Sequence, residues 1–300
     1  EISLGLVGSE MCIRDRGVIV GLGFTSCSDD EPNDPTIFPV DAANYDALDT
    51  WLIKNYTNPY NVDFQYKMKD IESNMSYDLV PADSAKAAKL AVIVKYLWFD
   101  AYAETVGTEF IKMNVPRVIM LVGSPAYNSD GSMVLGTAEG GLKVTLYNVN
   151  SLTDDLLKDY SSLNDFYFHT MHHEFTHILN QNQAYDTSFD AVTANGYVNG
   201  NWKTISDAEA HKKGFVSAYA MSEPKEDFAE MLSIYVTSSA TDWQRILDAA
   251  GTTGAASISK KMELVANYMM TAWNLDVDKL RSAVLHRANE LASLDLEHLN

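Results

Sequence analysis

The chain has 300 residues, of which 46% are hydrophobic and 21% are charged, and its formal net charge at pH 7 is −19. This length suffices for one large domain, or two small ones, with a hydrophobic core. The 22 lysine and arginine residues are scattered without a cluster and cannot neutralise a phosphate backbone, so we exclude nucleic acid as a partner.

The first forty residues are predicted to precede the folded domain. Residues 1–16 resemble translated read-through of a sequencing adaptor, and we leave them out of fold reasoning. Residues 17–26 form an apolar run too short to span a bilayer, which predicts a truncated signal peptide. The run Phe-Thr-Ser-Cys that ends at Cys27 resembles a bacterial lipobox, and this resemblance implies that Cys27 carries lipid. Residues 27–40 are rich in Asp and Pro and are expected to form an acidic, flexible tether.

The acidic stretch directly behind Cys27 is similar to the signals that send lipoproteins of the Bacteroidetes to the cell surface. It implies an outer-membrane lipoprotein that is exposed at the cell surface and held to the membrane by its lipid anchor alone. Cys12 lies in the excluded stretch, so Cys27 is the one cysteine left, and we expect no disulfide in the mature chain.

Residues 41–300 are predicted to form one α+β domain. Apolar periodicity and turn residues predict helices at 45–56 and 83–106, and strands at 62–69, 115–122 and 143–148. Asp83 or Ser84 is expected to cap the long helix and Gly107 to end it, and residues 128–131, Asn-Ser-Asp-Gly, predict a turn between strands. Beyond residue 230 we expect helices at 242–249, 258–274 and 277–294. This order predicts a small mixed sheet followed by a mainly helical C-terminal half.

The stretch His173-Glu174-Phe175-Thr176-His177 has the pattern H-E-x-x-H, which arises by chance in roughly one chain in a hundred. It lies within residues 163–181, where spaced apolar residues and the absence of Gly and Pro predict a mostly buried helix. One helical turn places His173 and His177 on the same face, where both rings can bind one zinc ion while Glu174 lies beside an open coordination position. The alternative, a structural histidine pair, would leave buried polar groups without partners.

The third ligand must come from elsewhere in the chain. The metzincin pattern fails, because Asn180 and Gln183 stand where it requires Gly and His. Downstream, Glu226 and Glu230 lie one helical turn apart, so one carboxylate can bind the metal while the other accepts a hydrogen bond from a ligand histidine. The residues themselves do not rank Glu226 above Glu230 or Asp227.

The sequence also indicates where the helix that carries these glutamates begins. Pro224 suits its first turn, and Ser222 is expected to cap it. The alternative is a solvated acidic helix start that the helix dipole favours. Phe228 and Leu232 make the segment too apolar to lie free on a surface.

Taken with residues 173–177, the segment from Tyr219 to Glu230 resembles the catalytic domain of the anthrax lethal-factor type of gluzincin metallopeptidase. The resemblance implies that Glu226 is the third zinc ligand, that Glu230 supports a ligand histidine, and that the Tyr219 hydroxyl stabilises an oxyanion. The alternative for Tyr219 is one more core aromatic among 16 tyrosines. A small sheet followed by an active-site helix and a helical half is also the plan of the zincin-like metallopeptidase fold.

The lipobox, the acidic tether and the zinc motif together resemble the substrate-import-associated zinc metallohydrolase lipoproteins of the Bacteroidetes, whose genes lie beside TonB-dependent importers. This resemblance covers nearly the whole mature chain. It implies a surface enzyme that works with a TonB-dependent importer, and it does not supply a substrate.

We therefore expect a zinc-dependent peptidase with a protein or peptide substrate. His173, His177 and Glu226 are expected to bind the ion, Glu174 to move the proton between the attacking water and the leaving amine, and Tyr219 to stabilise the oxyanion. Two alternatives stay open: a non-catalytic substrate-binding lipoprotein of the import complex, and a hydrolase of a non-peptide bond.

Two further expectations concern the surroundings of the metal. Residues 141–149 are expected to form an edge strand above it that pairs with extended substrate backbone, the alternative being an ordinary edge strand. His169 is expected to be packed or to face substrate rather than bind metal, and His172 to point to another face. His211, His286 and His298 have no motif around them.

Overall fold

The computed structural model describes residues 45–68, 78–127, 133–134, 136–139 and 142–299. The chain divides into Glu1–Asn44 and Tyr45–Asn300, and the described fold belongs to the second unit. The predicted leader, Cys27, the tether and the turn at 128–131 all lie outside the described residues. Within the described residues, no helix combines the length and the apolar character needed to cross a membrane.

The N-terminal part of the fold is helical. Its segments are α1 (Ala47–Leu52), the π-helical turn η1 (Ile53–Thr57), α2 (Asn58–Tyr60), α3 (Ser84–Val94), the π-helical turn η3 (Lys95–Phe99), α4 (Asp100–Val106) and α5 (Thr108–Asn114). The long predicted helix at 83–106 is confirmed as α3, η3 and α4 in succession. Asp83, not Ser84, is its cap, because the Asp83 carboxylate accepts the Lys86 N–H, and Gly107 ends the helix with a φ of +96°.

The sheet has four strands in the order β1 (Asp63–Gln65), β2 (Val118–Leu121), β6 (Lys143–Leu146) and β5 (Gly136–Glu139). The first three run parallel, and β5 runs antiparallel to β6, with Gly136 opposite Leu146. A separate two-stranded sheet joins β3 (Ala126–Tyr127) to β4 (Met133–Val134). The predicted edge strand at 141–149 is therefore wrong, because β6 lies between β2 and β5. The preceding strand, β5, folds back and pairs with the side of β6 that faces away from β2, so β5 is the edge strand on that side of the sheet.

The C-terminal half is helical, as predicted. Its helices are α6 (Tyr160–Leu163), the π-helical turn η6 (Asn164–Phe168), α7 (His169–Asn182), α8 (Ser188–Val192), α9 (Asp207–Lys212), α10 (Pro224–Thr237), α11 (Ala240–Trp273) and α12 (Val277–Glu290). Short 3₁₀ turns connect them: η4 (Val149–Ser151), η5 (Leu156–Lys158), η7 (Ala194–Gly196), η8 (Asn199–Thr204), η9 (Tyr219–Met221) and η10 (Leu291–Ser293). Gly251 interrupts α11 with φ +66° and ψ −178°, which explains why the sequence predicted two helices there. The predicted α+β fold, a small mixed sheet followed by a mainly helical half, is confirmed.

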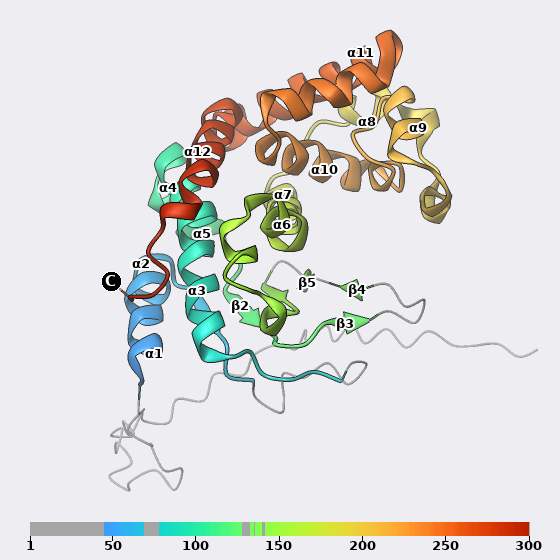
Figure 1. Cartoon of the computed structure of the whole chain (residues 1–300). Coiled ribbons are helices and arrows are strands. Elements are labelled where there is room, and N and C mark those ends of the chain that lie inside the picture. The colour runs from blue at the N-terminus through green and yellow to red at the C-terminus, as the bar shows by residue number, and fades with distance from the viewer. Residues whose placement is uncertain (1–44, 69–77, 128–132, 135, 140–141, 300) are drawn as a thin grey trace, which may run out of the picture. The chain divides into compact units, whose positions relative to one another are not determined.

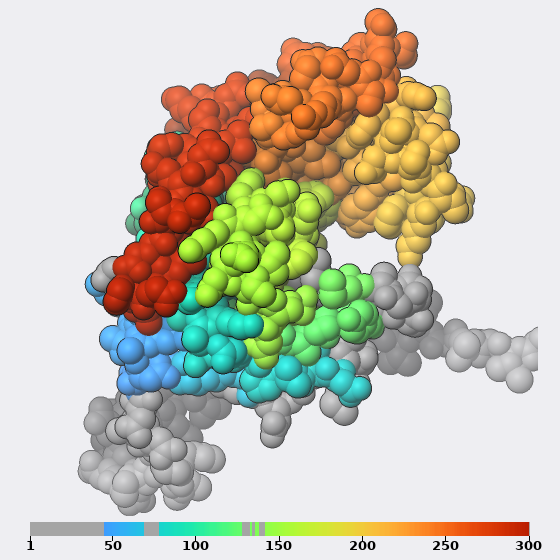
Figure 2. Space-filling model, in the orientation of Figure 1, coloured from blue at the N-terminus to red at the C-terminus, as the bar shows by residue number. Residues whose placement is uncertain are grey.

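Helix α7 lies between the sheet and α10 (Figure 1). Its buried face carries Phe175, whose ring contacts Trp98 and Tyr102 of the long N-terminal helix at centroid distances of 5.0 and 5.1 Å. Burying a phenylalanine side chain contributes about 1.5–3 kcal/mol, so this cluster holds the back of α7 in place. The surface is hollowed between β3 and the segment that carries α8 and α9 (Figure 2).

Candidate metal centre

Helix α7 presents three histidines on one face. His169, His173 and His177 are spaced four residues apart, so each ring stands one turn above the last. His172 points to the other side, as predicted, where its Nδ1 lies 2.9 Å from the Tyr102 hydroxyl. Burial lowers the pKa of His172 to about 3, so the ring is neutral.

Helix α10 brings two glutamates to the same place. Pro224 is its first residue, as predicted, which suits a position whose N–H would lack a helical partner. The predicted cap at Ser222 is wrong: Glu223 is the N-cap residue and makes no side-chain capping bond. Ser222 has helical backbone angles, and its hydroxyl donates to the Tyr219 carbonyl at 2.7 Å.

Three atoms converge where α7 meets α10. The Glu226 Oε2 atom lies 2.9 Å from His173 Nε2 and 3.3 Å from His177 Nε2, and the two ring nitrogens are 3.1 Å apart. Four ligands around zinc at 2.0–2.1 Å stand about 3.3–3.4 Å from one another, so these donor atoms need only small shifts to surround the ion. Two imidazoles and a carboxylate are also one of the ligand sets found in catalytic zinc sites.

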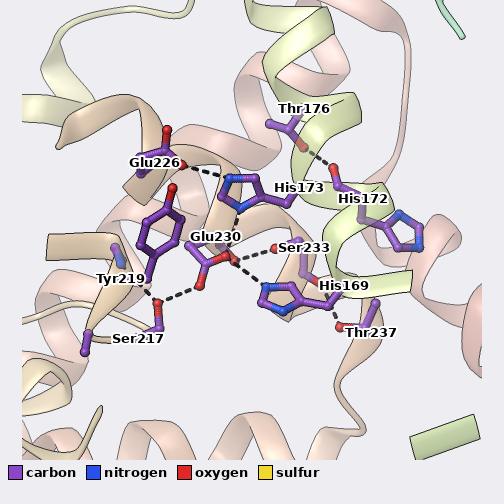
Figure 3. Close-up of polar contacts among 12 residues, drawn as sticks. His169, His172, His173, Thr176, Ser217, Tyr219, Glu226, Glu230, Ser233 and Thr237 are labelled. Carbon is purple, nitrogen blue, oxygen red and sulfur yellow. Dashed lines mark hydrogen bonds and ion pairs between the residues drawn. The ribbon is translucent and has the colours of Figure 1, made fainter. Parts of the chain in front are cut away.

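A second group shares His173 (Figure 3). Glu230 Oε1 lies 2.8 Å from His173 Nδ1 and 2.9 Å from His169 Nε2, and the Ser217 hydroxyl donates to Glu230 Oε2 at 2.6 Å. The described residues thus hold two groups with metal-ligand chemistry, one of His173, His177 and Glu226, and one of His169, His173 and Glu230. The sequence did not predict that His169 and Ser217 would contact Glu230.

The charges in this region stabilise one another. Burial alone would lower the pKa of His173, but its hydrogen bonds with Glu226 and Glu230 outweigh burial and raise this pKa to about 9. Burial raises the pKa of both glutamates, yet the neighbouring histidines more than offset it and hold each pKa below its usual range. Glu174 differs, because burial raises its pKa, which suits a group that must take up a proton.

Tyr219 lies beside these groups. Its ring centroid is 5.8 Å from that of His173 and 5.0 Å from that of Trp202, whose indole meets it edge-on. Burial and the charge of Glu226 raise the pKa of Tyr219, so the hydroxyl keeps its proton at neutral pH. Tyr219 is only partly buried, with 37% of its surface exposed, so the alternative of a core aromatic does not hold. Trp202 was missed by sequence reasoning, because a lone tryptophan in a polar turn carries no positional signal.

Asp227 faces away from the histidines. Its Oδ2 atom lies 2.5 Å from Lys261 Nζ, and both side chains are completely buried. The Tyr197 hydroxyl donates to the same oxygen at 2.9 Å. Of the three carboxylates that the sequence left unranked, Asp227 is therefore the one that anchors α10 to α11.

Comparisons with known proteins identify the family of this chain. The family described as "Putative zinc-binding metallo-peptidase" matches residues 41–278. A crystal structure of a putative zinc-binding metallo-peptidase from Bacteroides caccae is 42% identical in sequence and has a TM-score of 0.76, covering 84% of this chain and 95% of that one. A search of curated proteins gave no match. Because the family match extends over well more than half of the chain, this protein belongs to the family of putative zinc-binding metallo-peptidases.

Proposed function

We propose that the protein is a zinc-dependent peptidase of the gluzincin type, in which His173, His177 and Glu226 hold the ion. The convergence of two histidine Nε2 atoms and one glutamate oxygen, 2.9 to 3.3 Å apart, carries this proposal. The group of His169, His173 and Glu230 is the weaker candidate for a reaction centre. Although its His169 side chain is 35% exposed, its Glu230 carboxylate is only 4% exposed and already accepts the Ser217 hydroxyl, whereas Glu226 and His177 are 18% and 19% exposed and leave access for a substrate.

Three side chains of the protein have separate roles in the proposed reaction. Zinc, when bound, would supply a Lewis acid that polarises the substrate carbonyl and lowers the pKa of water. Glu174 takes the proton of the attacking water and delivers it to the leaving amine. The Tyr219 hydroxyl donates a hydrogen bond to the developing oxyanion. Glu230 accepts a hydrogen bond from His173 Nδ1, so that the Nε2 atom of the same ring keeps its lone pair free for the metal.

An extended substrate would pair with β5. Among the described residues, this strand is one of the two edge strands of the four-stranded sheet, and it is the one that passes close to the active-site helix: a Cβ atom added to Gly136 would lie 3.2 Å from Thr170 Cγ2 on α7. Free backbone N–H and C=O groups at a sheet edge bind extended peptides by adding a strand. This assigns to β5 the role that the sequence had suggested for residues 141–149.

We further propose that the enzyme acts as an outer-membrane lipoprotein at the cell surface beside a TonB-dependent importer. The lipobox-like residues before Cys27 and the acidic stretch behind it support this location. The similar structure from a Bacteroides species is in keeping with it. A tether of about a dozen residues spans at most about 3.3–3.6 Å per residue, which would keep the active site within a few tens of Å of the membrane.

Incubation of the purified protein with a mixed protein substrate, with and without a chelator, tests the activity. We expect cleaved peptides whose appearance stops with chelator and resumes with added zinc. The Glu174→Gln variant should bind zinc as tightly as the wild type and lose about 10²–10⁴ in rate, because an amide cannot accept the proton. Zinc binding without cleavage of any peptide or ester would instead indicate a binding lipoprotein, and cleavage of esters alone a non-peptide hydrolase.

A further inference from the structure

We propose that His169 and Ser217 are positioning residues of the metal centre, which together hold Glu230 in the orientation that aligns His173 with the ion. The inference rests on the proposed function, because it takes His173 as a zinc ligand. It adds two residues to that centre, one of them four positions before the H-E-x-x-H motif.

The histidines of α7 and the glutamates of α10 alternate in a single row. Glu226 Oε2 lies between the Nε2 atoms of His177 and His173, and Glu230 Oε1 lies between His173 Nδ1 and His169 Nε2. His173 therefore contacts one glutamate through each ring nitrogen. His169 ends the row, with 35% of its side chain exposed, and its Nε2 contact is to Glu230.

Ser217 fixes the other side of the same carboxylate. Its hydroxyl donates to Glu230 Oε2 at 2.6 Å and accepts the Ala220 N–H at 3.1 Å. The Ala218 N–H in turn donates to Asp207 at 2.7 Å, which anchors this turn to α9. The turn from 217 to 221 also carries Tyr219. Because Glu230 contacts both His173 and Ser217, it links the orientation of the His173 ring to the position of Tyr219.

Glu230 needs these partners because it is buried in the middle of α10. A buried carboxylate without hydrogen-bond donors is costly, and a glutamate has three side-chain torsions along which it can swing away. Three donors on two oxygens fix the carboxylate plane: His173 and His169 on Oε1, and Ser217 on Oε2. Loss of His169 leaves His173 as the remaining donor to Oε1. The Glu230 carboxylate can then turn while it keeps its hydrogen bond with the Ser217 hydroxyl.

Zinc affinity reports this role directly. Removing a group that orients a metal ligand typically weakens metal binding about 10–100-fold. We therefore expect His169→Ala and Ser217→Ala each to weaken zinc binding by about that factor, measured by competition with a chromophoric chelator. His169→Gln should restore most of the affinity, because the glutamine amide places an N–H donor near the position of the histidine Nε2. His286→Ala, a change of an exposed histidine on α12, is the matched control and should leave affinity unchanged.

Two further measurements test whether His169 positions Glu230 or binds the metal itself. The cobalt-substituted protein should keep the visible spectrum of a four-coordinate site in His169→Ala, because no ligand is lost. The double variant His169→Ala/Glu230→Ala should bind zinc no more weakly than Glu230→Ala alone, since His169 acts through Glu230.

The results distinguish this inference from the proposed function. A wild-type protein that binds no zinc contradicts the proposed function itself. A wild-type protein that binds one zinc ion, with equal affinity in His169→Ala, overturns only the positioning role. A changed cobalt spectrum in His169→Ala, or failure of His169→Gln to restore affinity, also overturns it.

Discussion

Replacing Lys261 with Met should destabilise the protein by about 3–5 kcal/mol, because removing one partner of a buried ion pair leaves the other charge uncompensated. The Lys261 ammonium lies 2.5 Å from Asp227 Oδ2, 2.9 Å from the Gly214 carbonyl oxygen and 3.8 Å from the centroid of the Phe215 ring. Methionine preserves the length of the side chain and can still pack against the Phe215 ring, but it has neither the charge nor the N–H donors that Asp227 and the Gly214 carbonyl require.

The structure shows why Asp227 cannot compensate for the loss. Its side chain is completely buried, and without Lys261 its remaining side-chain donor is the Tyr197 hydroxyl on Oδ2. The Oδ1 atom has no partner among the described residues. Burial already raises the pKa of Asp227 to about 6 against the opposing effect of Lys261. The expected loss is a large share of the roughly 5–15 kcal/mol that stabilises a typical domain.

Urea unfolding at saturating zinc measures the effect. Lys260→Met is the matched control, because Lys260 is 54% exposed and forms an ion pair with Glu263 on the same helix. It should change stability by less than about 0.5 kcal/mol. The double variant Lys261→Met/Asp227→Asn should recover most of the loss, since it buries no unpaired charge. A loss below about 1 kcal/mol in Lys261→Met, or a double variant as unstable as the single one, would refute the reasoning.

Three other changes test separate parts of the account. Tyr219→Phe should lower kcat about 10²–10³-fold in steady-state kinetics and leave zinc affinity unchanged, and an unchanged kcat would remove the hydroxyl from the mechanism. Gly254→Ala should cost about 1–3 kcal/mol in thermal unfolding, because its Cβ would lie 2.3 Å from the His211 carbonyl oxygen, whereas Gly200→Ala, with nothing within 4 Å, should cost almost nothing. Cys27→Ser should release the protein from the membrane fraction, and a variant that stays membrane-bound would contradict lipidation at this residue.

The sequence predicted the arrangement of α7 well, because helical periodicity alone determines which side chains share a face. The spacing of His173 and His177 predicted two rings on one side, and His172 was correctly expected on another. Caps were harder to predict. Asp83 and Gly107 lie at the two ends of the long helix as expected, whereas the Ser222 hydroxyl donates to a preceding carbonyl and does not cap α10.

Contacts between distant segments could not be predicted from one sequence. Glu226, Asp227 and Glu230 occupy little more than one helical turn, and only the packing of α10 against α7 and α11 separates them. Lys261 lies 34 residues beyond Asp227, with no local pattern that marks it as buried. The edge strand was assigned wrongly for the same reason, since β5 is a four-residue strand that is defined by its pairing with β6.

Zinc stoichiometry of the Glu226→Ala variant tests the central claim most directly. After reconstitution and removal of loosely held metal, the wild type should retain one zinc ion per chain and the variant less than about half, because a ligand is lost. Glu223→Ala, which changes an exposed glutamate at the start of the same helix, should retain zinc as the wild type does. Full retention of zinc by Glu226→Ala would contradict the ligand set of His173, His177 and Glu226.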